Sequence, residues 1–243
     1  MESDFPTELG TAVRAMENSG NPWGMSQGER ADWAKDLDGI DVIDGSDPMT
    51  AEYLYWVGCA GSFDDKNKKV TQAMAKLLQR ADISFAILGP AENCTGDPAR
   101  RSGNEYIFQM LAMQNIETLN GMGVKKIITQ CPHCFNTLLN EYPQVGGNYE
   151  VIHHTQLLEE LIDSVDGDGA LGLRNRALVE LVYSAGLRSA EAVGLDLGDV
   201  DFEQELVRVR GKGGKERIVP LGEEAAHVVA RYLREARPEL ARG

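Results

Sequence analysis

The fold is decided by the stretch EYLYWVGC, residues Glu52–Cys59. Its aromatic and aliphatic run is typical of a strand buried on both faces, and a cysteine follows almost at once. The same arrangement recurs twice, because Ile83–Pro90 precedes Cys94 and Lys126–Gln130 precedes Cys131. Segments of helical spacing separate these strands. This alternation predicts an α/β fold in which helices flank a parallel sheet.

Further elements extend the pattern on both sides. We expect a fourth strand over Tyr149–Thr155. We expect helices over Glu8–Glu17, Asp64–Arg80, Asn104–Met122, Phe135–Glu141 and Gln156–Ile162. The polar, turn-rich stretch Gly24–Pro48 is expected to wrap a surface.

Four cysteines, Cys59, Cys94, Cys131 and Cys134, are all that the chain contains. Ends of parallel strands with the same sense meet at one edge of a sheet, which is where such folds bind ligands. Four thiolates converging there would saturate an iron–sulfur cluster. A zinc site, a redox pair at Cys131–Cys134 and buried thiols without metal remain alternatives. The long gaps between the cysteines differ from the close pairs of zinc fingers.

Residues 53–162 resemble the cysteine-rich domain of heterodisulfide-reductase-type and glycolate-oxidase-type iron–sulfur oxidoreductases. The resemblance rests on the segments VGCAGSFD from Val57, ENCTGDPARRSGNEY from Glu92, CPHCFNTL from Cys131 and VIHHTQLL from Val151. It implies a [4Fe–4S] cluster on the four cysteines, used for electron transfer or for disulfide reduction, with Zn²⁺ as the alternative metal. One departure is Thr95, which stands where the family has the second cysteine of Cys-Cys-Gly.

The resemblance also implies a partner. The chain has one copy of the cysteine motif and lacks the compact CxxCxxCxxxCP ferredoxin run. We therefore expect electrons to come from a redox partner subunit or an upstream ferredoxin-type domain. Near the cysteines, Arg100 and Arg101 would either offset a cluster's negative charge or begin a solvated helix. His153 and His154, as neighbours on a strand, would point to opposite faces of the sheet.

Charge divides the chain into two parts. Residues 1–170 carry the whole net charge of −14, whereas residues 171–243 hold 12 basic and 12 acidic side chains. All three tryptophans also lie in the first part. We predict an N-terminal connector over residues 1–50, a cysteine-rich iron–sulfur domain over 51–163, a linker over 164–170 and a small α+β domain over 171–243.

The last part combines helices with a β-hairpin. We expect helices over Leu173–Leu187, Ser189–Leu195 and Gly222–Ala236, and hairpin strands over Leu206–Arg210 and Glu216–Pro220. Residues 171–238 resemble the opening of the catalytic domain of Xer-type tyrosine recombinases, which act in DNA integration and recombination. The phrases SAGLRSAEAVGLDLGDVDFE from Ser184 and VRVRGKGGKERIVPLGEEA from Val207 carry this resemblance.

The recombinase resemblance assigns three catalytic roles. Arg188 would clamp the scissile phosphate, Glu191 would support the site, and Lys212 would act as general acid at the leaving group. The family's His-x-x-Arg box and its nucleophilic tyrosine have no counterpart in this sequence, since Tyr183 and Tyr232 lie in other contexts. The set is incomplete, so we expect no strand cleavage by this chain alone.

Two readings of function follow from these patterns. The first is an electron-transfer or oxidoreductase domain with a recombinase-like tail, and the alternative is a DNA-binding integrase-like module carrying a metal-stabilised domain. DNA affinity should be weak, because the neutral tail offers little phosphate neutralisation. We expect no transmembrane helix and no signal peptide, and therefore a cytoplasmic protein.

Overall fold

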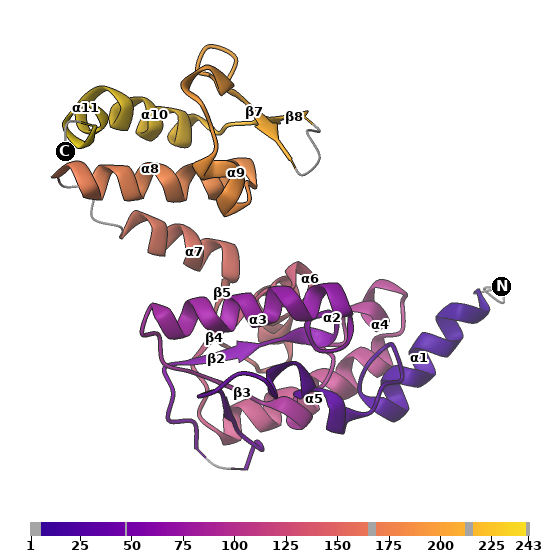
Figure 1. The fold of residues 1–243 in the computed structure, drawn as a ribbon. Helices are drawn as coiled ribbons and strands as arrows, with labels where there is room; N and C mark the ends of the chain where they lie inside the picture. The colour runs from indigo at the N-terminus through magenta and orange to yellow at the C-terminus, as the bar shows by residue number, and fades with distance from the viewer. Residues whose placement is uncertain (1–5, 47, 165–168, 212–215, 242–243) are drawn as a thin grey trace. The chain divides into compact units, whose positions relative to one another are not determined.

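A computed structural model describes residues 6–46, 48–164, 169–211 and 216–241 (Figure 1). The chain packs as two units, Met1–Leu157 and Leu158–Gly243. The boundary lies inside helix α7 (His154–Asp163). The position of the domain boundary expected at residues 163–170 stays a prediction.

A parallel sheet forms the centre of the first unit, as the sequence predicted, and it has five strands where the sequence indicated four. Across the sheet the strands follow the order β1 (Asp41–Val42), β3 (Phe85–Ile87), β2 (Tyr53–Trp56), β4 (Lys126–Thr129) and β5 (Glu150–His153). The stretch that decides the fold supplies the central strand β2, whose Leu54, Tyr55 and Trp56 are fully buried. Burial on both faces explains why this strand is apolar at consecutive positions.

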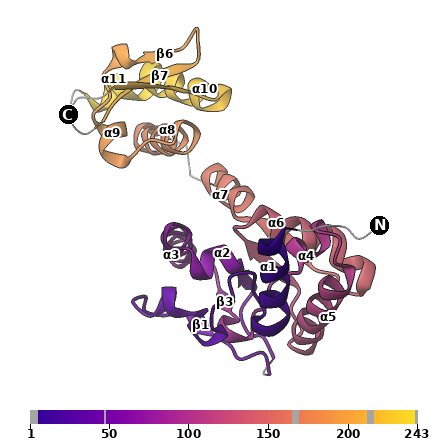
Figure 2. The same cartoon turned by 90° about the vertical axis from the view of Figure 1, so that its right-hand side faces the viewer.

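The path of the chain places helices on both faces of the sheet. The chain runs from β2 to β3 through α3 (Asp65–Arg80), then crosses back to β4 through α5 (Glu105–Gly121). These two crossovers run in opposite directions along the sheet, and right-handed connections then put their helices on opposite faces. Figure 2 shows α3 and α5 on the two sides of the sheet.

The two long helices begin at the residues, and bury the side chains, that their sequences indicate. The Asp64 side chain caps α3 by accepting from the backbone N–H of Lys66 and Asn67, and Asn104 caps α5 through the N–H of Ile107. Such caps satisfy N–H groups that the first turn leaves free. The core between the sheet and α5 includes Leu54, Trp56, Ile107, Phe108, Leu111, Leu119, Ile127 and Leu138.

Shorter helices surround the strand ends. They are α1 (Thr7–Ser19), α2 (Gly58–Phe63), α4 (Asp97–Arg101) and α6 (Pro132–Asn136), the last continuing as a π-helical turn over Thr137–Glu141. The stretch Gly24–Pro48 is more than a surface wrap, because it forms edge strand β1 and buries Trp33 and Arg30. Its polar composition concealed these two buried side chains.

The second unit is a small α+β arrangement. Its antiparallel sheet has the order β6 (Val200–Asp201), β7 (Leu206–Arg210) and β8 (Glu216–Pro220), so both predicted hairpin strands have the bounds expected from the sequence. Helices α8 (Gly169–Ala185), α9 (Ser189–Val193), α10 (Glu223–Arg231) and α11 (Arg237–Leu240) complete it, with a π-helical turn over Tyr232–Ala236 between the last two.

The core of the second unit lies between β7 and helices α8 and α10. Val207 and Val209 alternate with exposed residues along β7 and are fully buried, as the period of a half-buried strand requires. They pack with Leu173, Ala177, Leu181, Leu221, Ala225 and Val229.

In the part of the chain that the structure describes, no helix has the length and apolar character that crossing a bilayer requires.

Candidate metal centre

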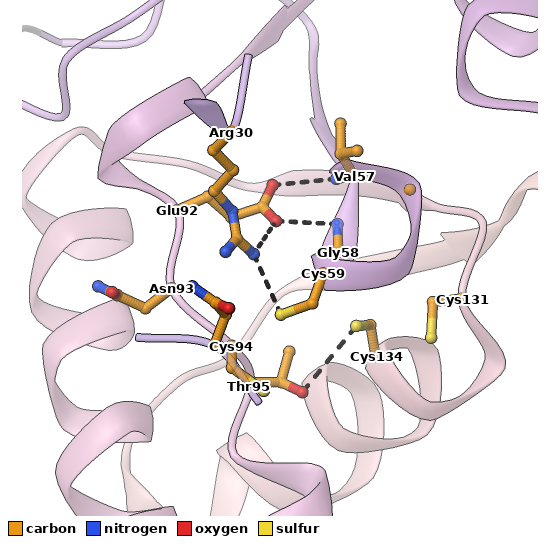
Figure 3. Close-up of polar contacts among 12 residues, drawn as sticks. Arg30, Val57, Gly58, Cys59, Glu92, Asn93, Cys94, Thr95, Cys131 and Cys134 are labelled. Atoms are coloured by element: carbon orange, nitrogen blue, oxygen red, sulfur yellow. Dashed lines mark hydrogen bonds and ion pairs between the residues drawn. The ribbon is translucent and has the colours of Figure 1, made fainter. Parts of the chain in front are cut away.

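The four cysteines gather where three adjacent strands end. Cys59 lies in the first turn of α2, just after β2, rather than at the strand end itself. Cys94 follows β3, and Cys131 and Cys134 lie at the start of α6, after β4. Strand β2 pairs with both β3 and β4, so the three segments are neighbours at one edge of the sheet (Figure 3).

The thiols form two hydrogen-bonded pairs. A hydrogen bond with Cys94 lowers the pKa of Cys59, and the same bond together with burial raises the pKa of Cys94. In the second pair a hydrogen bond with Cys134 lowers the pKa of Cys131 to about 6. The hydrogen bond with Cys131 and burial raise the pKa of Cys134, and charge on Cys59 and Cys94 adds to this effect, so the two pairs interact electrostatically.

The pairs do not close into a finished coordination shell. Among the described residues, no group of three or more His, Cys, Asp or Glu side chains is arranged to hold a metal ion. All four cysteines are free thiols, and three of them are buried while Cys131 is partly exposed. The site is thus a set of four free thiols at one sheet edge.

Gly58 leaves room beside these sulfurs. Its φ is +73°, a conformation that disfavours any residue with a Cβ. A Cβ at this position would lie 3.2 Å from the Sγ of Cys134 and 3.6 Å from the Cβ of Cys131. The glycine therefore brings bare backbone against the Cys131–Cys134 pair, where a side chain would crowd the sulfurs.

A buried ion pair borders the same site. The guanidinium of Arg30 donates to Glu92 Oε1 at 2.8 Å and to the Sγ of Cys59 at 3.4 Å. The Glu92 carboxylate also accepts from the backbone N–H of Val57 at 3.0 Å and of Gly58 at 2.8 Å (Figure 3). Side-chain exposure is 1% for Arg30 and 2% for Glu92. The carboxylate thus ties the loop after β3 to the start of α2.

The charge of Arg30 is secured by its surroundings. Burial lowers the pKa of Arg30, but attraction by Glu92 and Cys59 outweighs it and raises the pKa above its ordinary value. The guanidinium also donates to Gln27 at 3.2 Å and lies 5.5 Å from the centre of the Phe63 ring. Its buried Nε has no hydrogen-bond partner among the described residues.

A second set of polar contacts holds the loop that carries Cys94. Asn115, buried on α5, donates to the carbonyl of Cys94 and to the hydroxyl of Tyr142, both at 3.0 Å. The Tyr142 hydroxyl donates in turn to the carbonyl of Thr95 at 3.2 Å. Thr95 lies with its hydroxyl 4.0 Å from the Sγ of Cys134. The residue that replaces the family's second cysteine therefore still faces the sulfurs.

Arg100 and Arg101 meet carboxylates rather than sulfurs. Arg100 donates to Glu141 at 3.0 Å and stacks on the Phe108 ring at 4.3 Å from its centre. Arg101 pairs with Asp97 at 3.1 Å and with Glu141. In the described residues neither guanidinium contacts a cysteine, so these arginines form an ion-pair network beside the site.

The two histidines do not point apart as expected. His153 ends β5, whereas His154 begins α7, so the alternation of a strand is broken between them. Their rings meet edge to face with centres 4.6 Å apart. Burial, followed by the neighbouring His153, lowers the pKa of His154 to about 4. The His153 Nε2 lies 3.1 Å from the carbonyl of Gln130 and ties β5 to the loop before Cys131.

The second unit brings two of its three predicted site residues together. Glu191 Oε1 accepts from the Arg188 guanidinium at 2.9 Å, and its Oε2 accepts from the Arg188 backbone N–H. Arg217 on β8 makes two further bonds to Glu191, at 2.8 and 2.9 Å. These contacts, with Arg217 first, lower the pKa of Glu191 to about 2. Lys212 lies outside the described residues.

Two protein families match the chain in succession. Residues 53–139 match the family described as "Cysteine-rich domain", and residues 151–241 match the "Phage integrase family". The chain joins a cysteine-rich domain to an integrase-like domain. The integrase match begins at Val151, so it includes the segment VIHHTQLL that carries part of the resemblance to the cysteine-rich family.

Curated relatives divide in the same way. The chain is 47% identical over 163 residues to "EtfAB:quinone oxidoreductase" of Syntrophomonas wolfei, covering 66% of this chain and 23% of the relative. It is 41% identical over 165 residues to "Probable iron-sulfur-binding oxidoreductase FadF" of Bacillus subtilis, again covering 66% and 23%. It is 54% identical over 86 residues to "Tyrosine recombinase XerD" of Mycobacterium tuberculosis, covering 35% and 28%. The chain therefore spans about a quarter of each of these relatives.

The cysteine-rich part of the chain is thus similar to iron–sulfur oxidoreductases, as expected. Sequence reasoning missed Arg30 and Glu92 near its cysteines and Arg217 in the integrase-like domain. A signal existed for Glu92, which lies two residues before Cys94, and for Arg217, which lies within the hairpin phrase. Arg30 had none, because nothing in its polar surroundings separates it from a solvated arginine.

Proposed function

We propose that the cysteine-rich domain holds a [4Fe–4S] cluster on Cys59, Cys94, Cys131 and Cys134 and works as the electron-transfer domain of a heterodisulfide-reductase-type oxidoreductase. The observation that supports this most is the meeting of four sulfur donors at the ends of three adjacent strands. When bound, such a cluster would take up and release one electron at a time.

The residues of the chain fit this role in several ways. Gly58 keeps the space beside Cys131 and Cys134 free of a side chain. Arg30 brings a buried positive charge to Cys59, and thiolate ligands would otherwise accumulate negative charge without compensation. Asn115 fixes the backbone of the Cys94 loop, which limits movement of that donor. Positioning by such outer contacts is what keeps a metal centre rigid.

The partner is proposed to be another electron carrier, either a redox subunit or a ferredoxin-type domain. Relatives bear the names "EtfAB:quinone oxidoreductase" and "Probable membrane-anchored ferredoxin", and the chain covers 23% and 22% of their lengths. The remaining steps of any electron path would then lie in other domains. Four free thiols are kept reduced in a cytoplasm, and this is where we place the protein.

The experiment that tests the cluster is anaerobic purification followed by iron and sulfide analysis, with visible and electron paramagnetic resonance spectra. We expect about four irons per chain. Replacing Cys131 and Cys134 together by serine should abolish the cluster signal. Ser62→Ala is a matched control, because Ser62 is buried on the same helix as Cys59 but carries no thiol. A colourless protein with one zinc per chain would refute the proposal.

A second candidate function is DNA binding by the integrase-like domain, and the Arg188–Glu191–Arg217 group favours it. Glu191 holds Arg188 from both its backbone and its side chain, while 78% of the Arg188 side chain stays exposed. A guanidinium oriented in this way can bind a phosphate with two donors. Arg188→Ala should weaken duplex binding in fluorescence anisotropy, whereas Arg231→Ala on α10 should not. An equal loss of DNA affinity in both variants would mean that overall positive charge, and not the oriented Arg188 guanidinium, binds the duplex.

We further propose that this chain alone does not cleave DNA. The sequence contains no His-x-x-Arg box to complete the group of Arg188, Glu191 and Lys212. Transfer to a tyrosine would leave a covalent protein–DNA adduct, which denaturing gels detect. We expect no such adduct with a nicked duplex substrate, and its appearance would overturn the proposal.

A further inference from the structure

The part of the chain before the central strand delivers a cation to the cysteine site. Arg30 follows a short 3-10 helix over Gln27–Glu29, outside the matched family region 53–139. Its guanidinium nevertheless lies against the Sγ of Cys59 at 3.4 Å, with 1% of the side chain exposed. Gln27 also donates to the carbonyl of Glu92 at 3.0 Å and to the Asn93 side chain at 2.9 Å. This segment is therefore held directly against the Cys94 loop.

Stability alone is a weak reason for such a cation. Removing two charges from water is expensive, and well-packed apolar residues often replace a buried ion pair without loss. The Nε of Arg30 has no partner among the described residues, so the guanidinium is not fully satisfied by the protein. A buried donor left without a partner is unfavourable. The contact of the guanidinium with Cys59 therefore explains the buried cation better than stability does.

The arrangement of the pair gives the sulfur a positive neighbour. The Glu92 carboxylate is shared among three donors, namely Arg30 and the backbone N–H groups of Val57 and Gly58. The positively charged guanidinium contacts both this carboxylate and Cys59, because one of its nitrogens, Nη2, donates to both. Because the guanidinium stays charged at every working pH, this positive charge is permanent.

We propose that Arg30 is a positioning residue that raises the reduction potential of the cluster through Cys59. The inference rests on the proposed function, since it concerns the group that the four cysteines would hold. One-electron reduction adds one negative charge to the cluster and its thiolates, with the electron supplied by the redox partner or, in a titration, by dithionite. Hydrogen bonds to ligand sulfurs and nearby positive charge favour that more negative state. Arg30 supplies both to Cys59.

The test is a potentiometric titration of the cluster in the whole chain, followed by electron paramagnetic resonance. The double variant R30M/E92Q removes both charges, so net charge is unchanged and an oxygen still accepts from backbone N–H. Its midpoint potential should shift to a more negative value. The variant R30K keeps the charge but not the planar fork, and should show a smaller shift in the same direction.

The matched control is R100M/E141Q. It removes another arginine–glutamate pair of the same domain, which bonds at 3.0 Å and contacts no cysteine among the described residues. We expect its potential to equal that of the unaltered chain. A shift as large as in R30M/E92Q would overturn the inference, because the effect would then not depend on contact with Cys59.

The remaining outcomes also decide the matter. Full iron content with an unchanged potential in R30M/E92Q overturns the role of Arg30 and leaves the proposed function intact. If R30M/E92Q holds no iron, R30K decides, and an unchanged potential there overturns the inference. An unaltered chain that holds no iron–sulfur cluster overturns the proposed function and this inference with it.

Discussion

Replacing Gly58 by alanine tests whether bare backbone is needed beside the sulfurs. The glycine has a φ of +73°, and left-handed backbone costs a residue with a Cβ about 1–2 kcal/mol. Alanine also restricts the unfolded chain, which returns about 0.4–1 kcal/mol. The metal-free protein should therefore lose about 1 kcal/mol of stability, the difference between these two effects.

A second effect concerns the position of the Cys134 sulfur. The new Cβ would lie 3.2 Å from the Sγ of Cys134, a contact so tight that the sulfur must move by a few tenths of an ångström. Misplacing a group that orients a ligand typically lowers metal affinity by about 10- to 100-fold. We expect Gly58→Ala to release iron to a chelator at correspondingly lower chelator concentration.

Gly123→Ala is the matched control for Gly58→Ala. Gly123 has a φ of +72°, but nothing lies within 4 Å of a Cβ built there. Both variants should lose stability in urea, with Gly58→Ala losing at least as much as Gly123→Ala; fluorescence reports this unfolding because all three tryptophans lie in the first unit. Iron retention should separate them. Equal retention of iron by the two variants would refute the claim that the cysteine site needs a residue without a side chain at position 58.

Three other perturbations have expected outcomes. Glu92→Ala leaves Arg30 buried without its carboxylate and should cost about 3–5 kcal/mol in urea denaturation, whereas Glu52→Ala, at an exposed ion pair, should change little. In metal-free protein, iodoacetamide should label Cys131 before the other cysteines, at a rate that rises through pH 6 because the pKa of Cys131 is lowered to about 6. Mass spectrometry of the labelled peptides gives the order of labelling, and earlier labelling of another cysteine would contradict this prediction. The pKa of Glu191 is lowered from 4.5 to about 2, so its carboxylate stabilises the fold above pH 4.5 and this contribution is lost as the pH falls towards 2. In circular dichroism measured against pH, Glu191→Gln should therefore lose less structure between pH 4.5 and 2 than the unaltered chain. An identical profile for the two proteins would contradict the ion pairs of Glu191.

Periodicity was sufficient to predict the longer helices and the central strands. Three patterns predict the elements that the structure contains: the apolar run of β2, the amphipathic spacing of α3 and the alternation of β7. The hairpin strands also have the predicted bounds. The parallel arrangement followed from the alternation of strands with helices, and its strand order then brought the cysteine segments together. These features depend on local pattern, which a single sequence displays.

Long-range polar contacts escaped prediction. Arg30 and Glu92 are 62 residues apart in sequence, and nothing in their neighbourhoods reveals that they meet. The edge strand β1 has two exposed residues, too few to show a period. His153 and His154 were placed on one strand because the sequence did not show that α7 begins at His154. Each of these features depends on tertiary structure rather than on local spacing.

The burial of N-terminal residues determines at which residue a shortened version of this domain can begin. Met16 on α1 is fully buried in the core, and Arg30 is fixed beside Cys59. A fragment that begins at Ala51 would keep every cysteine and the whole matched family region, yet it would expose the core surface that Met16 covers. Anyone isolating the domain should therefore begin upstream of Thr7, where α1 starts. Family boundaries drawn from sequence similarity understate the piece of chain that folds.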